Sequence, residues 1–136
     1  MTLLMRRKLC GNNMCSKVWR PGSDVALTTD SWTSITMTNY IAVTAHYITE
    51  QFELGSCLLE CFQFTERHTA ENVKSELMRV VKDWNIEGKV VDAVTDNAAN
   101  IVAAVKQTGF KHVPCFARTL NLVVQDALQS LAAVLL

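Results

Sequence analysis

The sequence is poor in the residues that mark unusual protein classes. Among its 136 residues there are 2 prolines and 5 glycines, which excludes a collagen-like or low-complexity chain. The 13 Lys and Arg residues balance 13 Asp and Glu residues, and charged residues make up only 19% of the chain. This balance argues against a basic nucleic-acid tail, an acidic tail and general disorder. With 49% apolar residues, the chain fits one globular domain.

A long apolar run is also missing. No segment approaches the roughly 18 apolar residues that a membrane helix needs. At the N-terminus a few apolar residues precede Arg6, Arg7 and Lys8, which is the reverse of the order in a secretory signal. We therefore expect no membrane partner.

The five cysteines form an odd, scattered set, for which a reducing compartment is the simpler interpretation. Cys57 and Cys61 lie in an extended run, where four residues span about 13 Å. Two ligands of one zinc must each lie about 2.3 Å from it, so we predict buried small side chains here instead. Cys10 and Cys15 lack the downstream His pair of a zinc finger.

Two kinds of hydrophobic period are present. Alternation and β-branched residues predict strands at 25–31, 40–49 and 54–64, and shorter apolar runs predict strands at 89–95 and 112–115. We expect Leu54, Leu58, Phe62 and Phe64 to share one strand face, and the 89–95 strand to be buried on both faces. Helical periods follow Thr69 and Asp96–Asn97, which are predicted helix caps, and the apolar residues from Leu120 to Leu131 predict a third helix.

This order predicts an α/β fold. Three antiparallel strands followed by β-α units form a mixed sheet covered by helices. Residues 1–23 are predicted to be a poorly determined leader, and residues 24–136 the domain. The last helix carries Leu120, Val124, Leu128 and Leu131, which we expect to pack on the sheet. Its apolar, uncapped end predicts a domain that is incomplete at the C-terminus and a chain that forms homo-oligomers.

Two acidic residues occupy parallel positions. Asp30 ends the first predicted strand, and Asp96 ends the fourth and opens a helix. Catalytic and binding groups of α/β sheets gather at the carboxyl ends of strands. If the two strands are neighbours, the pair could hold Mg²⁺ or Mn²⁺, which prefer oxygen ligands. The alternative, favoured by spacing alone, is a helix cap at Asp96 and a turn acid at Asp30.

Five blocks of the sequence, in order, resemble the hAT superfamily of DNA transposases, and most closely the BED-zinc-finger proteins domesticated from it. The resemblance covers about residues 24–131. The blocks are Thr28-Thr29-Asp30-Ser31-Trp32-Thr33-Ser34, Tyr40–Ile48, His68-Thr69-Ala70-Glu71-Asn72-Val73, Val94-Thr95-Asp96-Asn97-Ala98-Ala99-Asn100 and Pro114–Leu122.

The resemblance implies an RNase H-like fold, a DNA partner and a nuclear location. It also implies that Asp30 and Asp96 are the first two of three acidic residues that bind the catalytic Mg²⁺ or Mn²⁺ ions. The third, a Glu, lies far downstream in that family, and this chain stops before it. Residues 1–23 do not resemble the BED finger that precedes the domain in the family.

The last block departs from the family. A Cys-x-x-His pair near the scissile phosphate reads Cys115-Phe116-Ala117-Arg118 here. Arg118 can contact phosphate, and Cys115 shares its helix face, but an Arg stays charged and cannot transfer a proton near neutral pH. We therefore expect a regulatory, DNA-associated protein that does not cleave DNA alone and binds metal weakly. There are two alternatives. The chain is part of a metal-dependent transposase that downstream residues complete, or it is an inactive fragment.

Overall fold

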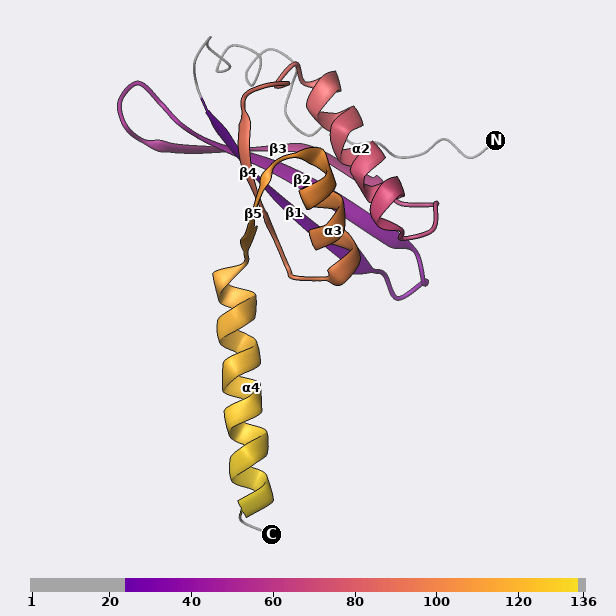
Figure 1. Ribbon diagram of the computed structural model, residues 1–136, viewed down its shortest axis with the longest axis vertical. Coiled ribbons are helices and arrows are strands. Elements are labelled where there is room, and N and C mark those ends of the chain that lie inside the picture. The colour runs from indigo at the N-terminus through magenta and orange to yellow at the C-terminus, as the bar shows by residue number, and fades with distance from the viewer. Residues whose placement is uncertain (1–23, 135–136) are drawn as a thin grey trace.

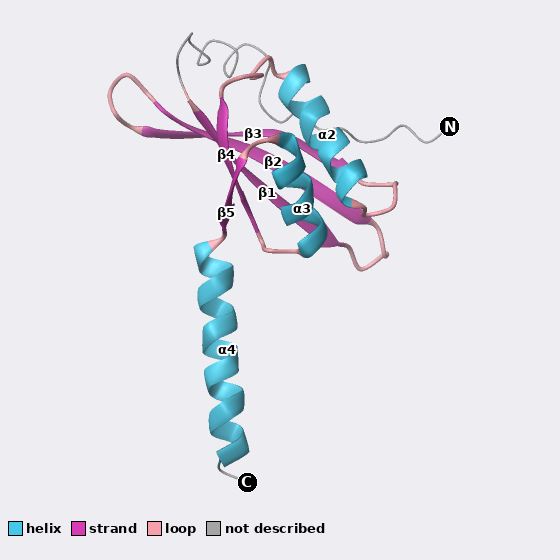
Figure 2. Ribbon diagram, in the orientation of Figure 1, coloured by secondary structure: helices cyan, strands magenta, loops and turns pink. Residues whose placement is uncertain are grey.

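Strands and helices alternate along residues 24–134, the part of the chain that the computed structural model describes (Figures 1 and 2). Side chains are described as far as residue 131. The predicted leader, with Cys10 and Cys15, lies outside these residues. The elements are β1 (Val25–Thr33), β2 (Asn39–Ile48), β3 (Leu54–Gln63), α2 (Ala70–Asp83), β4 (Val90–Thr95), α3 (Ala99–Thr108), β5 (Lys111–Pro114) and α4 (Phe116–Val134).

The strands form one mixed sheet in the order β3-β2-β1-β4-β5. Short turns join β1 to β2 and β2 to β3, and both pairs are antiparallel. The chain then crosses over through α2 and through α3, so that β4 pairs parallel to β1 and β5 parallel to β4. This confirms the predicted mixed α/β sheet.

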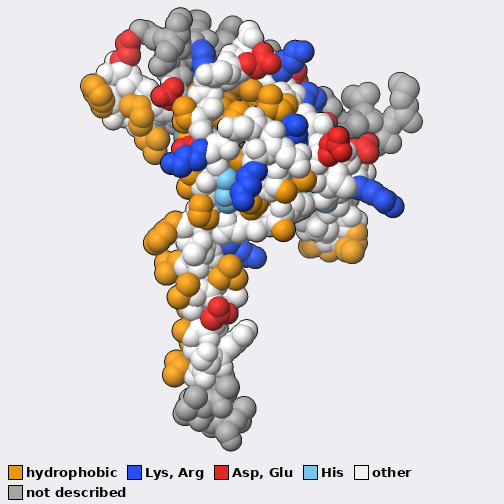
Figure 3. Space-filling model, in the orientation of Figure 1, with side chains coloured by type: hydrophobic (Ala, Val, Ile, Leu, Met, Phe, Trp, Pro, Cys, Tyr) orange, Lys and Arg blue, Asp and Glu red, His pale blue; other side chains and the backbone are white. Residues whose placement is uncertain are grey.

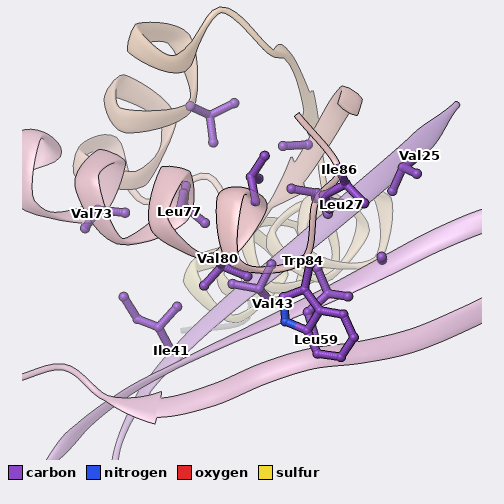
Figure 4. Packing of buried hydrophobic residues seen from close by; sticks show 14 of the residues in the cluster. Val25, Leu27, Ile41, Val43, Leu59, Val73, Leu77, Val80, Trp84 and Ile86 are labelled. Carbon is purple, nitrogen blue, oxygen red and sulfur yellow. The ribbon is translucent and has the colours of Figure 1, made fainter. Parts of the chain in front are cut away.

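Helices α2 and α3 lie side by side on one face of the sheet (Figure 1). The predicted cap is confirmed, because the Thr69 hydroxyl accepts a hydrogen bond from the Asn72 backbone N–H at 3.3 Å. The apolar stripe of α2 meets the apolar residues of the strands in one core (Figure 4). The buried side chains of α2 are Val73, Leu77, Val80 and Val81, and the C-cap residue Trp84 is buried beside them.

A β-bulge makes the predicted face of β3 wrong in part. Val43 of β2 pairs with Glu60, whereas Thr44 pairs with Leu58, so Leu59 is an extra residue. The bulge reverses which side chains point to the core. Leu54 is therefore 74% exposed and Leu58 is half-buried, while Phe62 and Phe64 are buried as predicted. The buried residues of this segment are Cys57, Leu59, Glu60, Phe62 and Phe64.

The two strand cysteines are consequently not equivalent. The bulge lies between them, so Cys57 is buried on the helix-covered face and Cys61 is half-buried on the other. The prediction of two buried side chains is correct for Cys57 only. Burial raises the pKa of the Cys61 thiol, because it disfavours the thiolate.

Two predictions for the second half of the sheet are also wrong. Strand β4 is not buried on both faces: Val91 is 47% exposed, because α2 and α3 cover only one side. Helix α3 begins one to two residues later than predicted, because its N-cap is Ala98 and not Asp96 or Asn97, and no side chain caps it. Gly109 ends it in a left-handed conformation, φ 86°, as its position after the helix predicts.

Helix α4 does not pack on the sheet. It leaves the end of β5 and projects from the domain, with hydrophobic side chains along its length (Figures 1 and 3). Every side chain from Phe116 to Leu131 is exposed, including the four that were expected to contact the sheet. The side chains of Val134 to Leu136 lie outside the described residues. None of the described helices has the length and apolar character to cross a membrane.

Candidate metal and phosphate site

The two predicted acids lie at the same level of neighbouring strands. Strand β1 runs parallel to β4, and Thr28 pairs with Val94. Asp30 and Asp96 each follow two residues later. Two-residue spacing keeps Asp30 on the face of Thr28, which α2 and α3 leave uncovered, whereas Asp96 lies just beyond the end of β4. Asp30 is exposed and Asp96 half-buried.

Asp30 was predicted to end the first strand, but the structure places the end of β1 three residues later, at Thr33. Asp30 lies within β1, because β1 continues to pair with β2 as far as Thr33, and Asp30 itself pairs with Ala42. Asp96 directly follows the last residue of β4. The backbone at Asp30 is therefore held by a strand ladder, whereas that at Asp96 is part of a loop.

Both acids line a single cavity of about 590 Å³. The start of α4 forms its other wall, where the Cys115 backbone N–H donates to the Thr95 carbonyl at 2.9 Å. All four predicted site residues thus lie around the same cavity. Its lining consists of Thr28, Thr29, Asp30, Ser31, Val94, Thr95, Asp96, Cys115, Ala117, Arg118 and Asn121.

The loop after β4 directs the Asp96 carboxylate. Its Oδ1 accepts a hydrogen bond from the Ala98 backbone N–H at 3.2 Å, so the acid shapes the turn that precedes α3. Asn97 has φ 70°, in the left-handed region, and its side-chain amide donates to the Thr119 hydroxyl of α4 at 3.4 Å. The same short loop therefore contacts both walls of the cavity.

Arg118 supplies the positive charge of the site. It lies one helical turn after Cys115, and both side chains line the cavity. Within the described residues, no acidic side chain forms an ion pair with it. The donor set of two carboxylates suits a hard cation, and the guanidinium suits a phosphate. Among the same residues, no group of three His, Cys, Asp or Glu side chains converges on one point.

Sequence reasoning missed Asn121 and the hydroxyl groups of β1. Asn121 follows Arg118 by three residues, so helical spacing alone would have placed it on the same side of α4. Thr28 and Ser31 come from the strand that carries Asp30. Their contribution was not predictable, because it depends on where α4 leaves the sheet.

Comparison with known proteins identifies the family of this chain. The sequence model of the ZBED1 RNase-like domain family matches residues 28–112. The chain belongs to this family. The match includes Asp30 and Asp96 and ends before Cys115. The mixed sheet fits the RNase H-like fold that the hAT resemblance implied, and that resemblance is confirmed.

Several curated proteins from different organisms are similar to this chain. An AC transposase of Zea mays is 32% identical over 125 residues, which cover 81% of this chain and 16% of the maize protein. Zinc finger BED domain-containing protein 6 of Homo sapiens is 32% identical over 116 residues, covering 75% of this chain and 12% of the human protein. A transcriptional regulator of Talaromyces stipitatus is 24% identical over 120 residues, covering 79% of this chain and 14% of that protein. The chain thus spans about a sixth or less of the length of these relatives.

Proposed function

We propose that this ZBED1 RNase-like domain is a nuclear, DNA-associated regulatory domain that does not cleave DNA on its own. The observation that carries the proposal is the single cavity that brings Asp30, Asp96 and Arg118 together. Two carboxylates and a permanent cation can bind a divalent ion and a phosphate side by side. Relatives that include a BED zinc finger protein and a transcriptional regulator support the regulatory role and the nuclear location.

The metal would be Mg²⁺ or Mn²⁺, held by Asp30 and Asp96. One oxygen of Asp96 is engaged by the Ala98 N–H, which leaves the second free for a cation. Asp30 is exposed and contributes both of its oxygens. A site with so few protein ligands binds Mg²⁺ weakly, in the millimolar range, because Mg²⁺ gives up its water reluctantly.

The DNA contact would be made through phosphate. Arg118 is exposed at the cavity wall, and its guanidinium matches the geometry of phosphate oxygens. The net charge of zero indicates that this contact is local, since surfaces that follow a DNA backbone over many phosphates are basic.

Two features support the absence of cleavage by this chain alone. Two-metal phosphoryl transfer uses carboxylates that hold the metals on both the attacking and the leaving oxygen. Among the described residues, Asp30 and Asp96 are the acids of the cavity. Arg118 stands where the hAT family has a His, and it cannot accept and release protons near neutral pH.

The test is an incubation of the purified chain with labelled transposon-end DNA and Mn²⁺. We expect no specific nicking by the wild-type chain. Nicking that disappears in Asp30→Ala and Asp96→Ala, but persists in Asp126→Ala, would establish a nuclease instead. Asp126 is the matched control because it is an exposed acid on α4 that does not line the cavity.

A second candidate function is that of a metal-dependent transposase domain, active in strand cleavage and transfer when further residues complete it. The register of Asp30 and Asp96 and the 32% identity to the maize AC transposase favour it. A longer protein that contains this domain and a further acid at the cavity would then nick the same DNA.

A further inference from the structure

Thr95 joins the separate parts of the cavity wall. It is the last residue of β4, and only 1% of it is exposed. Its hydroxyl lies 2.9 Å from Nε2 of His112 on β5, and the Asn97 backbone N–H donates to it at 3.4 Å. Its carbonyl accepts from the Cys115 N–H. Strand β5, the Asp96 loop and the start of α4 therefore all bond to this one residue.

We assign the Thr95 hydroxyl as the donor to His112, although an imidazole nitrogen allows either direction according to its tautomer. A hydroxyl that accepts from the Asn97 N–H still has its own proton to donate. Donation to Nε2 of His112 places the imidazole proton on Nδ1. Because the Thr95 hydroxyl is buried, water would not replace His112 if this bond were lost.

The corresponding residue of β1 shows that burial alone does not require this bond. Thr29 precedes Asp30 as Thr95 precedes Asp96, and it is buried with 5% exposure. Its hydroxyl has no hydrogen-bond partner among the described residues. Asp30 needs no such support, because its backbone is held in the ladder with Ala42. Asp96 lies beyond the last ladder residue of β4, so side-chain bonds must fix it.

We propose that Thr95 is a positioning residue, with His112 as its partner. It keeps the Asp96 carboxylate and the first turn of α4 in one fixed arrangement, so that Arg118 stays at the cavity opposite the acid. What the cavity binds rests on the proposed function. The arrangement itself is a property of the free chain and is tested without a ligand.

The test compares Thr95→Val, which keeps the shape and removes the hydroxyl, with Thr95→Ser, which keeps the hydroxyl. We expect hydrogen exchange at the Asn97 amide, which donates to the hydroxyl, to be about three- to tenfold faster in Thr95→Val, the effect of one lost hydrogen bond. The Cys115 and Ala98 amides should exchange faster by a similar factor, because the Thr95 carbonyl and the Asp96 loop to which they bond are then held less firmly. Exchange in Thr95→Ser should stay within about twofold of wild type on the same scale. The Val80 amide of α2 should be unchanged in both and serves as the internal control.

The imidazole of His112 gives a second readout, which a purely structural role of Thr95 would not move. Its ¹⁵N shifts should indicate a proton on Nδ1 in wild type and Thr95→Ser, and a different pattern in Thr95→Val. His112→Phe removes the partner from β5 and should reproduce the faster exchange at Cys115 and Ala98, which keeps the test valid if Thr95→Val folds poorly.

Unchanged exchange at Cys115 and Ala98 in both Thr95→Val and His112→Phe would overturn the proposal. Equal acceleration in Thr95→Ser and Thr95→Val would overturn it as well, because the hydroxyl would then be irrelevant. Titration of the same samples with Mn²⁺ tests the proposed function separately. A wild-type chain that binds no Mn²⁺ but shows the expected exchange pattern contradicts the metal site and supports the positioning role.

Discussion

Arg79 of α2 pairs with carboxylates on its own helix and on the sheet. Its guanidinium donates to both oxygens of Glu60 on β3 at 3.1 and 3.2 Å, to Glu76 at 2.8 Å and to Asp83 at 2.9 Å. It also lies over the Phe62 ring, 5.2 Å from the centroid. Burial alone would lower the pKa of Arg79, but the hydrogen bonds and charges of Glu60 and Glu76 raise it above its ordinary value.

Glu60 makes this pairing important for stability, because the β-bulge turns its carboxylate into the core, where its side chain is 1% exposed. Arg79→Met should lower the free energy of unfolding by about 3 kcal/mol, since it leaves a buried charge without this cation. Lys74→Met on the same helix removes an equal charge and should change stability by less than about 0.5 kcal/mol. Urea unfolding followed by circular dichroism measures both, and equal effects would contradict the argument.

Arg118 is the residue on which the proposed DNA contact depends. Arg118→Ala should weaken binding to short DNA duplexes by a similar factor for all sequences, and the slope of log K against log salt should fall by about 1. Arg67→Ala removes the same charge from an exposed loop away from the cavity and should leave the slope unchanged. Fluorescence anisotropy at several salt concentrations distinguishes the two. An unchanged slope in Arg118→Ala would exclude the phosphate contact.

At the scale of the elements, the hydrophobic period of the sequence predicted α2 and β2 well and the other elements less well. The stripe of α2 and the alternation of β2 face the same core, and both were predicted correctly. The face of β3 was not predictable, because the extra residue Leu59 arises from pairing with β2. Whether the side chains of β4 and α4 are buried depends on which face of the sheet the helices pack against. A single sequence does not show which face that is.

Helix α4 has an apolar stripe that the described fold leaves uncovered. Leu120, Val124 and Leu131 are 51%, 48% and 60% exposed, and helical geometry places them on one side. Arg118 and Asp126 are its charged residues and lie off the stripe. We expect the chain to self-associate through this helix, as exposed apolar patches of this kind do.

Sedimentation equilibrium of Leu120→Gln/Leu131→Gln tests this expectation. The double variant should be monomeric at concentrations where wild type is associated, because both substitutions lie on the stripe. Phe52→Gln is the matched control, since Phe52 is 90% exposed in the β2–β3 turn, away from α4. It should associate like wild type. A monomeric wild-type chain at high concentration would show that the stripe alone does not drive association.

For the whole molecule, the order and direction of the strands decide which predicted site residues lie together. Asp30 and Asp96 were found from their places at strand ends, and the parallel pairing of β1 with β4 brings them to one level. Cys115 and Arg118 were placed by resemblance, and the β5–α4 junction brings them to the same cavity. Thr95 was outside the reach of sequence reasoning, since a buried threonine in a strand is ordinary and its partner His112 is 17 residues away.

If the proposed metal site exists, we expect divalent cations at this cavity to stabilise the fold. Asp30 and Asp96 carry like charges at one cavity, and a bound cation neutralises their repulsion. With a dissociation constant of about 4 mM, about 20 mM Mg²⁺ stabilises the folded chain by about 1 kcal/mol. For a domain of this size, that corresponds to a rise in Tm of about 3–5 °C.

Thermal unfolding with Mg²⁺, against NaCl of equal ionic strength, measures this coupling. We expect the rise in wild type and in Asp126→Asn, and none in Asp96→Asn or Asp30→Asn. The metal-free Tm of the last two variants should be higher than that of wild type, because each removes one of two repelling charges. A rise of equal size in Asp96→Asn would show that Mg²⁺ acts elsewhere on the molecule, and the two acids would then be structural residues of the strand ends.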